Sequence, residues 1–166
     1  MLRRADENLR VAGMRIERIV DASAVHEAAE LFDAPPLAAA TERFLAERGH
    51  HLLLAYDDEG RAVGMITGVE MTHPDKGTEM FVYELSVAPE ARRRGAGTAL
   101  VIELAAIARR NGCYGMWVGT EPGNDAAIAT YRRAGASEEA AFTLLNWDLI
   151  AMTHDAESRR AADPIG

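Results

Sequence analysis

The sequence contains a single cysteine, Cys113, among its 166 residues. One thiol cannot form a disulfide within the chain, and no group of cysteines and histidines has the spacing of zinc ligands. These absences exclude a disulfide-stapled secreted domain, and they predict a reducing compartment and no metal. Cys113 is then expected to be a small core residue.

Positive charge and aromatic rings are also scarce. The chain has 26 acidic and 18 basic side chains, a formal net charge of -8 and only 6% aromatic residues. DNA, RNA and anionic membranes are bound mainly through positive charge, and single strands also by stacking on aromatic rings. The composition therefore predicts neither nucleic acid nor membrane as a partner, and it favours a small cationic ligand.

The N-terminal segment lacks a long hydrophobic run. In "MLRRADENLRVAG" the basic residues have no apolar segment behind them, which predicts neither a secretory signal nor a membrane anchor. We expect a cytoplasmic protein with one domain over residues 14–150, because the first strand-like run begins at Met14. Residues 1–13 are predicted to be an N-terminal extension and residues 151–166 a loosely ordered tail.

The hydrophobic pattern changes its period several times along the chain. Short apolar, β-branched runs predict strands over 14–21, 50–57, 61–72, 79–89, 114–120 and 140–149. Apolar residues at helical spacing predict helices over 22–33, 34–49, 98–110 and 124–135. This order predicts an α/β fold with a mixed sheet, in which an antiparallel meander is followed by a β-α-β-α-β unit and helices cover both faces.

The stretch "EARRRGAGTAL", residues 90–100, places three arginines and a Gly-x-Gly at the start of a predicted helix. Glycines let successive N–H groups turn into one concavity, and a helix N-terminus adds unpaired donors that bind phosphate oxygens. The dinucleotide fingerprint is excluded because Leu100 stands at its third glycine, and the Walker turn because Gly-Lys-Ser/Thr is absent. A solvated charged turn is the alternative.

The spacing Arg92-x-x-Gly95-x-Gly97 resembles the pyrophosphate-binding signature, Gln/Arg-x-x-Gly-x-Gly/Ala, of the GNAT superfamily of acyl-CoA-dependent N-acyltransferases. In that family the signature also follows a three-strand meander. It precedes a helix, a strand and a helix that carries asparagine and tyrosine, here Asn124 and Tyr131. The resemblance covers residues 15–149 and implies a GNAT-like fold with acetyl-CoA as co-substrate.

Three segments give a narrower resemblance, to the gentamicin (aminoglycoside) 3-N-acetyltransferase branch: "ELFD", "FVYELSVAPEARRRGAGTALV" and "NDAAIATYRRAGASEEAAF". This resemblance implies an aminoglycoside acceptor and a homodimer. The apolar strand predicted over 140–149 also favours a homodimer, because its edge would need a partner. The chain departs from the branch at Glu84, where the branch usually has an aspartate.

The family resemblance also implies where the co-substrate binds. Backbone N–H groups of the turn, helped by its arginines, would hold the pyrophosphate, and these residues are Arg92, Arg93, Arg94, Gly95, Ala96, Gly97 and Thr98. A backbone N–H near Leu85, Ser86 or Val87 would meet the thioester oxygen, where the family's fourth strand splays open at a bulge. Asn124 would orient the pantetheine arm or cap its own helix.

Two residues are implied in catalysis. Glu84 would be the base, directly or through water, or a carboxylate that only attracts a cationic substrate, and Glu79 is the alternative base. Tyr131 would donate a proton to the leaving thiolate or only pack its ring. The histidines at strand and loop edges, His51 among them, are expected at the surface.

The sequence thus predicts an acetyltransferase that moves the acetyl group of acetyl-CoA to an amine of a small cationic substrate. The predicted acceptor is an aminoglycoside, acetylated at the 3-N position by direct attack in a ternary complex. A protein, peptide or polyamine amine is the alternative acceptor. A non-catalytic acyl-CoA-binding module is the alternative function class, since one fold can host either.

Overall fold

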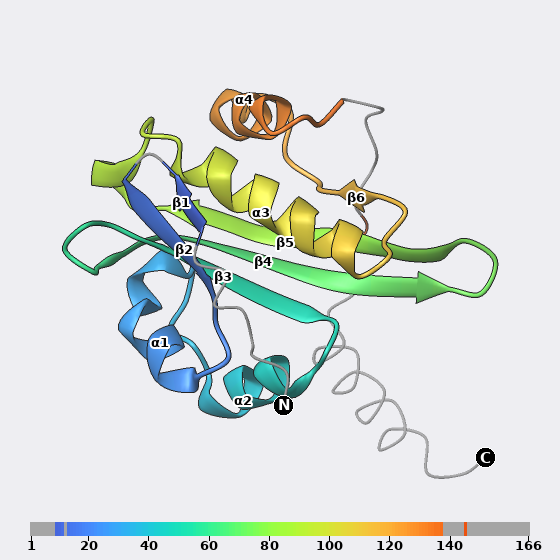
Figure 1. Ribbon diagram of the computed structural model, residues 1–166, viewed down its shortest axis with the longest axis horizontal. Coiled ribbons are helices and arrows are strands. Elements are labelled where there is room, and N and C mark those ends of the chain that lie inside the picture. The colour runs from blue at the N-terminus through green and yellow to red at the C-terminus, as the bar shows by residue number, and fades with distance from the viewer. Residues whose placement is uncertain (1–8, 12, 138–144, 146–166) are drawn as a thin grey trace, which may run out of the picture. The chain divides into compact units, whose positions relative to one another are not determined.

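The computed structural model describes residues 9–11, 13–137 and 145, and its strands form one mixed sheet (Figure 1). Over these residues the sheet has six strands in sequence order, namely β1 (Leu9–Val11), β2 (Met14–Arg18), β3 (His50–Tyr56), β4 (Ala62–His73), β5 (Gly77–Val87) and β6 (Met116–Trp117). Neighbours from β1 to β5 are antiparallel, and β5 and β6 are parallel. The predicted mixed α/β sheet is confirmed.

The sheet begins before the predicted domain boundary at Met14. Strand β1 pairs with β2 in a hairpin whose register joins Leu9 to Ile16 and Val11 to Met14. Gly13 lies in the turn with a φ of 79°, a conformation that glycine adopts without strain. Part of the segment predicted as an extension over residues 1–13 is therefore a strand of the sheet.

Helices cover both faces of the sheet, as predicted (Figure 1). On one face lie α3 (Ala96–Arg110) and α4 (Asp125–Arg133), and Leu100 and Leu104 of α3 are fully buried against the strands. On the other face lie α1 (Ala22–Glu27), the short 3-10 helix η1 (Ala29–Leu31) and α2 (Ala38–Ala46). Two apolar cores result, one on each side of the sheet.

The two helices predicted in the first third of the chain are shorter in the structure. The helix predicted over 22–33 ends at Glu27 and continues as the separate 3-10 turn. The helix predicted over 34–49 begins only at Ala38. Pro35 and Pro36 explain this delay, because the residue before a proline is pushed out of the α conformation. The loop between η1 and α2 is consequently longer than the sequence suggested.

Strand β5 carries a one-residue bulge at Tyr83. Thr67 of β4 pairs with Glu84, whereas the next residue, Gly68, pairs with Val82, so Tyr83 has no partner in the ladder. Side chains alternate along a strand, and an extra residue reverses the alternation beyond it. Val82 is buried towards α3, so Glu84 faces the opposite side of the sheet.

Gly68 brings α3 close to the sheet opposite this bulge. A Cβ atom at Gly68 would lie 2.8 Å from Cδ2 of Leu104 and 2.8 Å from Sδ of Met80. Both neighbours are completely buried, so they have little room to move aside. The absence of a side chain at Gly68 thus fixes the distance between α3 and the bulged part of the sheet.

His51 is completely buried, so the expectation that it lies at the surface is wrong. It belongs to β3, which is flanked by β2 and β4 in the middle of the sheet. Its Nε2 atom lies 2.7 Å from Oε1 of Glu70, and Nδ2 of Asn111 donates to the same oxygen at 2.6 Å. Burial lowers the pKa of His51, which keeps the imidazole neutral. This group ties β3 and β4 to the end of α3.

The strand predicted over 140–149, apart from Leu145, and the tail predicted over 151–166 lie outside the described residues. Among the helices that the structure describes, none is long and apolar enough to cross a membrane.

We predict that Gly68→Ala lowers the free energy of unfolding by about 1–3 kcal/mol, because the added methyl group overpacks the contact between α3 and β5. Urea denaturation measures the change. Gly115→Ala is the matched control, since no atom lies within 4 Å of a Cβ atom placed there. Equal stability of the two variants would show that the contact between α3 and the sheet tolerates a side chain at position 68.

Candidate active site

The arginine-glycine turn connects β5 to α3 through the 3-10 turn η2 (Pro89–Ala91). Arg93 and Gly95 have φ values of 60° and 89°, so the backbone turns sharply twice within three residues. The Arg93 and Arg94 side chains are exposed, and neither forms an ion pair with another residue in the described part of the chain. They are free to meet an anion.

The first turn of α3 presents unpaired backbone donors. Its N-cap is Gly95, which has no side chain to cap the helix, and the first helical hydrogen bond runs from the Ala99 N–H to the Gly95 carbonyl at 2.9 Å. The N–H groups of Ala96, Gly97 and Thr98 therefore have no helical acceptor and lie at the positive end of the helix dipole. This is the arrangement that the sequence predicted for a phosphate site.

Gly97 is the contact point between this turn, α4 and the end of β5. A Cβ atom at Gly97 would lie 3.2 Å from Cγ2 of Thr130 and 3.5 Å from Cγ2 of Val87. A larger residue would therefore push α3 away from both neighbours. The close packing brings the signature turn next to the helix that carries Tyr131.

Strand β5 has an open edge beyond the bulge. β6 pairs with β5 only at Met80 and Phe81, so the later part of β5 has no described strand on that side. The Ala88 N–H bonds to β4, and alternation then turns the N–H groups of Leu85 and Val87 towards the open edge. The Val87 carbonyl on this edge accepts a hydrogen bond from Nε of Arg92 at 3.0 Å.

Ser86 differs from its two neighbours. The Ala88 N–H bonds to the Val63 carbonyl of β4, and a residue two positions earlier points its N–H group the same way, so the Ser86 N–H faces β4 rather than the open edge. Of the three residues predicted near the thioester oxygen, Leu85 and Val87 therefore have N–H groups without an acceptor among the described residues, and Ser86 does not.

Glu84 lies in β5 just before Leu85, and its side chain is on the face of the sheet opposite α3. Its Oε1 atom is buried and has no hydrogen-bond partner among the described residues. Burial raises the pKa of Glu84, the negative charge of Asp33 raises it further, and a backbone hydrogen bond from Asp33 opposes the rise in part. A half-buried carboxylate with a raised pKa and a free oxygen is suited to accept a proton.

Asp33 is a site residue that the sequence analysis missed. It lies in the loop between η1 and α2, and it is exposed. The segment "ELFD" that ends at Asp33 supported the narrower family resemblance, but it gave no role to the aspartate. Its effect on Glu84 depends on a contact across 51 residues of sequence, which no local pattern reports.

Tyr131 lies on α4, and its ring packs against the core between the sheet and α3. Burial raises the pKa of Tyr131, so the phenol is protonated at neutral pH. Its hydroxyl makes no hydrogen bond to any residue that the structure describes. A protonated phenol without a hydrogen-bond partner among the described residues is suited to donate a proton.

Asn124 and Glu79 already have partners. Oδ1 of Asn124 accepts from the Ala127 N–H at 3.3 Å, which makes Asn124 the N-cap of α4. Glu79 accepts from the Tyr114 hydroxyl at 2.9 Å. The bulge leaves Glu79 four ladder positions before Glu84, or about 13 Å along the strand. The structure therefore does not bring the two glutamates together.

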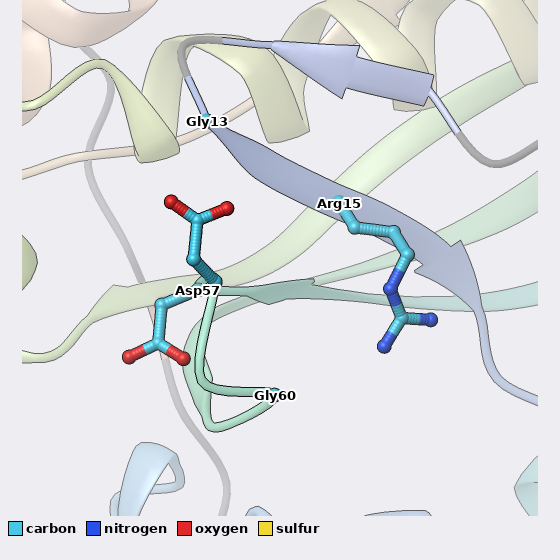
Figure 2. A pocket seen from close by; sticks show the side chains of 5 residues that line it. Gly13, Arg15, Asp57 and Gly60 are labelled. Atoms are coloured by element: carbon cyan, nitrogen blue, oxygen red, sulfur yellow. The ribbon is translucent and has the colours of Figure 1, made fainter.

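A polar pocket lies elsewhere, between β2 and the turn after β3 (Figure 2). It is lined by Gly13, Arg15, Asp57, Asp58 and Gly60. Asp57 is already engaged in its own turn, where it accepts hydrogen bonds from the backbone and side chain of Arg61. None of the predicted site residues lines this pocket. Over the described residues no cluster of three histidines, cysteines or carboxylates could hold a metal ion.

The model of the acetyltransferase (GNAT) family matches residues 17–136, which include the signature turn, Glu84 and Tyr131. The chain belongs to the acetyltransferase (GNAT) family. The family resemblance drawn from Arg92-x-x-Gly95-x-Gly97 is thus confirmed. GNAT acetyltransferases use acetyl-CoA as co-substrate, so the predicted class of enzyme and its co-substrate are those of the family.

This GNAT chain is similar in sequence to a curated acetyltransferase and similar in fold to several solved structures. The L-2,4-diaminobutyric acid acetyltransferase of Nocardia farcinica (strain IFM 10152) is 35% identical over 82 residues, which cover 47% of this chain and 42% of that protein. The match therefore spans less than half the length of the curated relative.

Solved structures extend the similarity over most of the GNAT domain. An aminoglycoside acetyltransferase from an uncultured soil metagenomic sample has a TM-score of 0.75 at 18% identity, covering 82% of this chain and 97% of that chain. An aminoglycoside 6'-N-acetyltransferase from Acinetobacter baumannii has a TM-score of 0.68 at 20% identity, covering 82% and 99%. At these identities the likeness supports the fold. The 3-N branch suggested by the sequence is not confirmed.

We predict that Glu84→Gln raises the Tm of this acetyltransferase at about pH 8, and that the gain shrinks towards about pH 4. The folded-state pKa of Glu84 is raised, so its stabilising contribution is complete below the unfolded-state pKa and is lost as the pH rises through the folded-state pKa. Glutamine removes that loss. Glu42→Gln, at an exposed position on α2, is the control. A Glu84→Gln variant that is less stable than wild type at about pH 8 would contradict the conclusion that the charged carboxylate of Glu84 is unfavourable in the folded protein.

Proposed function

We propose that the chain transfers the acetyl group of acetyl-CoA to an amine of a small cationic acceptor by direct attack in a ternary complex. The observation that carries the proposal is the bulge at Tyr83, which places available N–H groups and an unpartnered carboxylate oxygen on adjacent residues of one strand. The unpaired N–H groups of α3 lie at the same end of β5 and supply a site for the pyrophosphate.

Each chemical step has a candidate residue. Glu84 removes a proton from the substrate ammonium, which frees the nitrogen lone pair to form a bond with the thioester carbonyl carbon. The N–H groups of Leu85 and Val87 bind the oxygen that becomes negative at this stage. As the carbon–sulfur bond breaks, Tyr131 donates its proton to the departing thiolate, and the nitrogen loses its second proton to solvent to give the neutral amide. Proton exchange with solvent returns both side chains to their starting forms.

An aminoglycoside is the acceptor that we favour, with acetylation at the 3-N position as the narrower resemblance suggests. The diaminobutyrate and aminoglycoside acetyltransferases similar to this chain are named for small acceptors that carry amino groups. The two neighbouring carboxylates of Glu84 and Asp33, together with the net charge of -8, would attract such cations. The homodimer and the cytoplasmic location expected from the sequence are part of the same proposal.

Acetyl-CoA turnover with a panel of acceptors tests the proposal. Purified protein is incubated with acetyl-CoA and an aminoglycoside, a polyamine or a lysine peptide, and free thiol is measured. We expect thiol release with the aminoglycoside and an increase in Tm with acetyl-CoA alone. Stabilisation by acetyl-CoA without thiol release for any amine would favour the non-catalytic binding module. Faster release with the peptide would favour a protein acceptor.

Two conservative variants test the assigned chemistry. Glu84→Gln should lower kcat by roughly 10²- to 10⁴-fold, and activity should recover partly at high pH, where more of the amine is already neutral. Tyr131→Phe keeps the packed ring and should lower kcat with little change in KM. An unchanged pH profile and a raised KM in Glu84→Gln would limit Glu84 to cation binding. Undiminished turnover in Tyr131→Phe would limit Tyr131 to packing.

A further inference from the structure

Three aromatic side chains form a continuous row on the sheet beside Glu84. The rings of Phe81 and Trp117 lie 4.4 Å apart between centroids at an angle of 37°. Phe81 and Tyr83 lie 5.9 Å apart in an edge-to-face arrangement. We call Trp117, Phe81 and Tyr83 the aromatic row.

The row is exposed in a way that folding alone does not explain. Tyr83 is 72% exposed and Trp117 is 42% exposed, although aromatic residues are only 6% of the sequence. Large aromatic side chains are usually buried in the core, because their burial removes a large apolar area from water. Exposed rings that gather in one place, next to a reactive group, mark a surface for ligand contact.

The fold fixes the position of the row relative to the proposed base. Phe81 alternates with the buried Val82, so it lies on the face of the sheet opposite α3, and the bulge puts Glu84 on that same face. Trp117 is the parallel partner of Phe81 on β6. Phe81 and Glu84 are two ladder positions apart, or about 7 Å along the strand.

Carboxylates lie on both sides of Phe81 and Tyr83 along β5. Glu84 and Asp33 lie at the end near Tyr83, and Glu79 lies two residues before Phe81 on the same face of β5. Aromatic faces attract ammonium groups, and they also bury the apolar face of a ring framework. This combination fits a molecule that carries several ammonium groups on a ring framework. A short linear diamine could reach Glu84 without touching the row.

We propose that the aromatic row is an extended acceptor subsite that selects amines carried on a ring framework over short linear amines. The inference rests on the proposed function. Only if Glu84 contacts the reacting amine does the aromatic row contact the rest of the acceptor molecule. Tyr83 is the principal residue of this subsite. It is the bulged residue itself, and its exposed ring lies next to Glu84 in the chain.

Steady-state kinetics with two acceptors tests the subsite. Sisomicin represents the ring-framework amine and 1,3-diaminopropane the short linear amine. In Tyr83→Ala we expect KM for sisomicin to rise about tenfold, kcat to stay within about twofold, and both constants for the diamine to stay unchanged. Tyr83→Phe should restore KM, since it keeps the ring. Ile102→Ala, an exposed apolar position on α3, should match wild type.

Trp117→Ala repeats the test from the other strand and should also raise KM for sisomicin alone. Equal changes for both acceptors, or no change for sisomicin in Tyr83→Ala, would overturn the subsite and leave the acetyltransferase function standing. Calorimetric titration with sisomicin covers the case in which neither amine is acetylated. Weaker binding by Tyr83→Ala than by wild type would then support the subsite while the proposed reaction fails. No binding of sisomicin by wild type would overturn the subsite.

Discussion

The one-residue bulge at Tyr83 is the constraint on which the rest of the site depends. Without it, strict alternation would turn the Glu84 side chain into the apolar core beneath α3. With it, Glu84 faces the opposite side, and the N–H groups of Leu85 and Val87 face the open edge of β5. Gly68 holds α3 close to the bulged segment, because any side chain there would collide with Leu104 and Met80. A single extra residue therefore turns Glu84, the proposed base, away from the core and turns these two N–H groups towards the open edge.

The same geometry explains how an acidic protein accommodates two ligands of opposite charge. The helix α3 begins after β5 ends, so its positive dipole end and the arginines of the turn lie on the side where we propose that the phosphates bind. The carboxylates of Glu84 and Asp33 lie on the side where we propose that the amine binds. In the proposed mechanism β5 runs between the two ligands, so that each charge meets its own ligand and the reacting carbon lies at the boundary. The pKa of Glu84 is raised because burial, and then the charge of Asp33, disfavour the charged form of its carboxylate.

The sequence predicted the order of most elements and the signature turn, because hydrophobic period and turn chemistry are local properties. It did not predict β1, since three residues are too few for a clear alternation. The burial of His51 was missed because His51 lies near the start of the strand predicted over 50–57, beside a loop, whereas that strand is central in the sheet. The role of Asp33 depends on a contact between a loop and β5, and the position of the bulge depends on pairing between strands. A single sequence reports neither. Glu84 and Tyr131 came from the family resemblance rather than from any pattern of their own.

Hydrogen–deuterium exchange of the backbone amides, with and without CoA, tests the central claim most directly, because it reads the N–H groups themselves. The account predicts that CoA slows exchange at Leu85 and Val87 on the open edge of β5 and at Ala96 to Thr98 in the first turn of α3. Amides in the last turn of α3, from Ile107 to Arg110, should not change. Unchanged exchange at both the β5 edge and the α3 turn under saturating CoA would contradict the account, because the bulge would then open no site for the co-substrate.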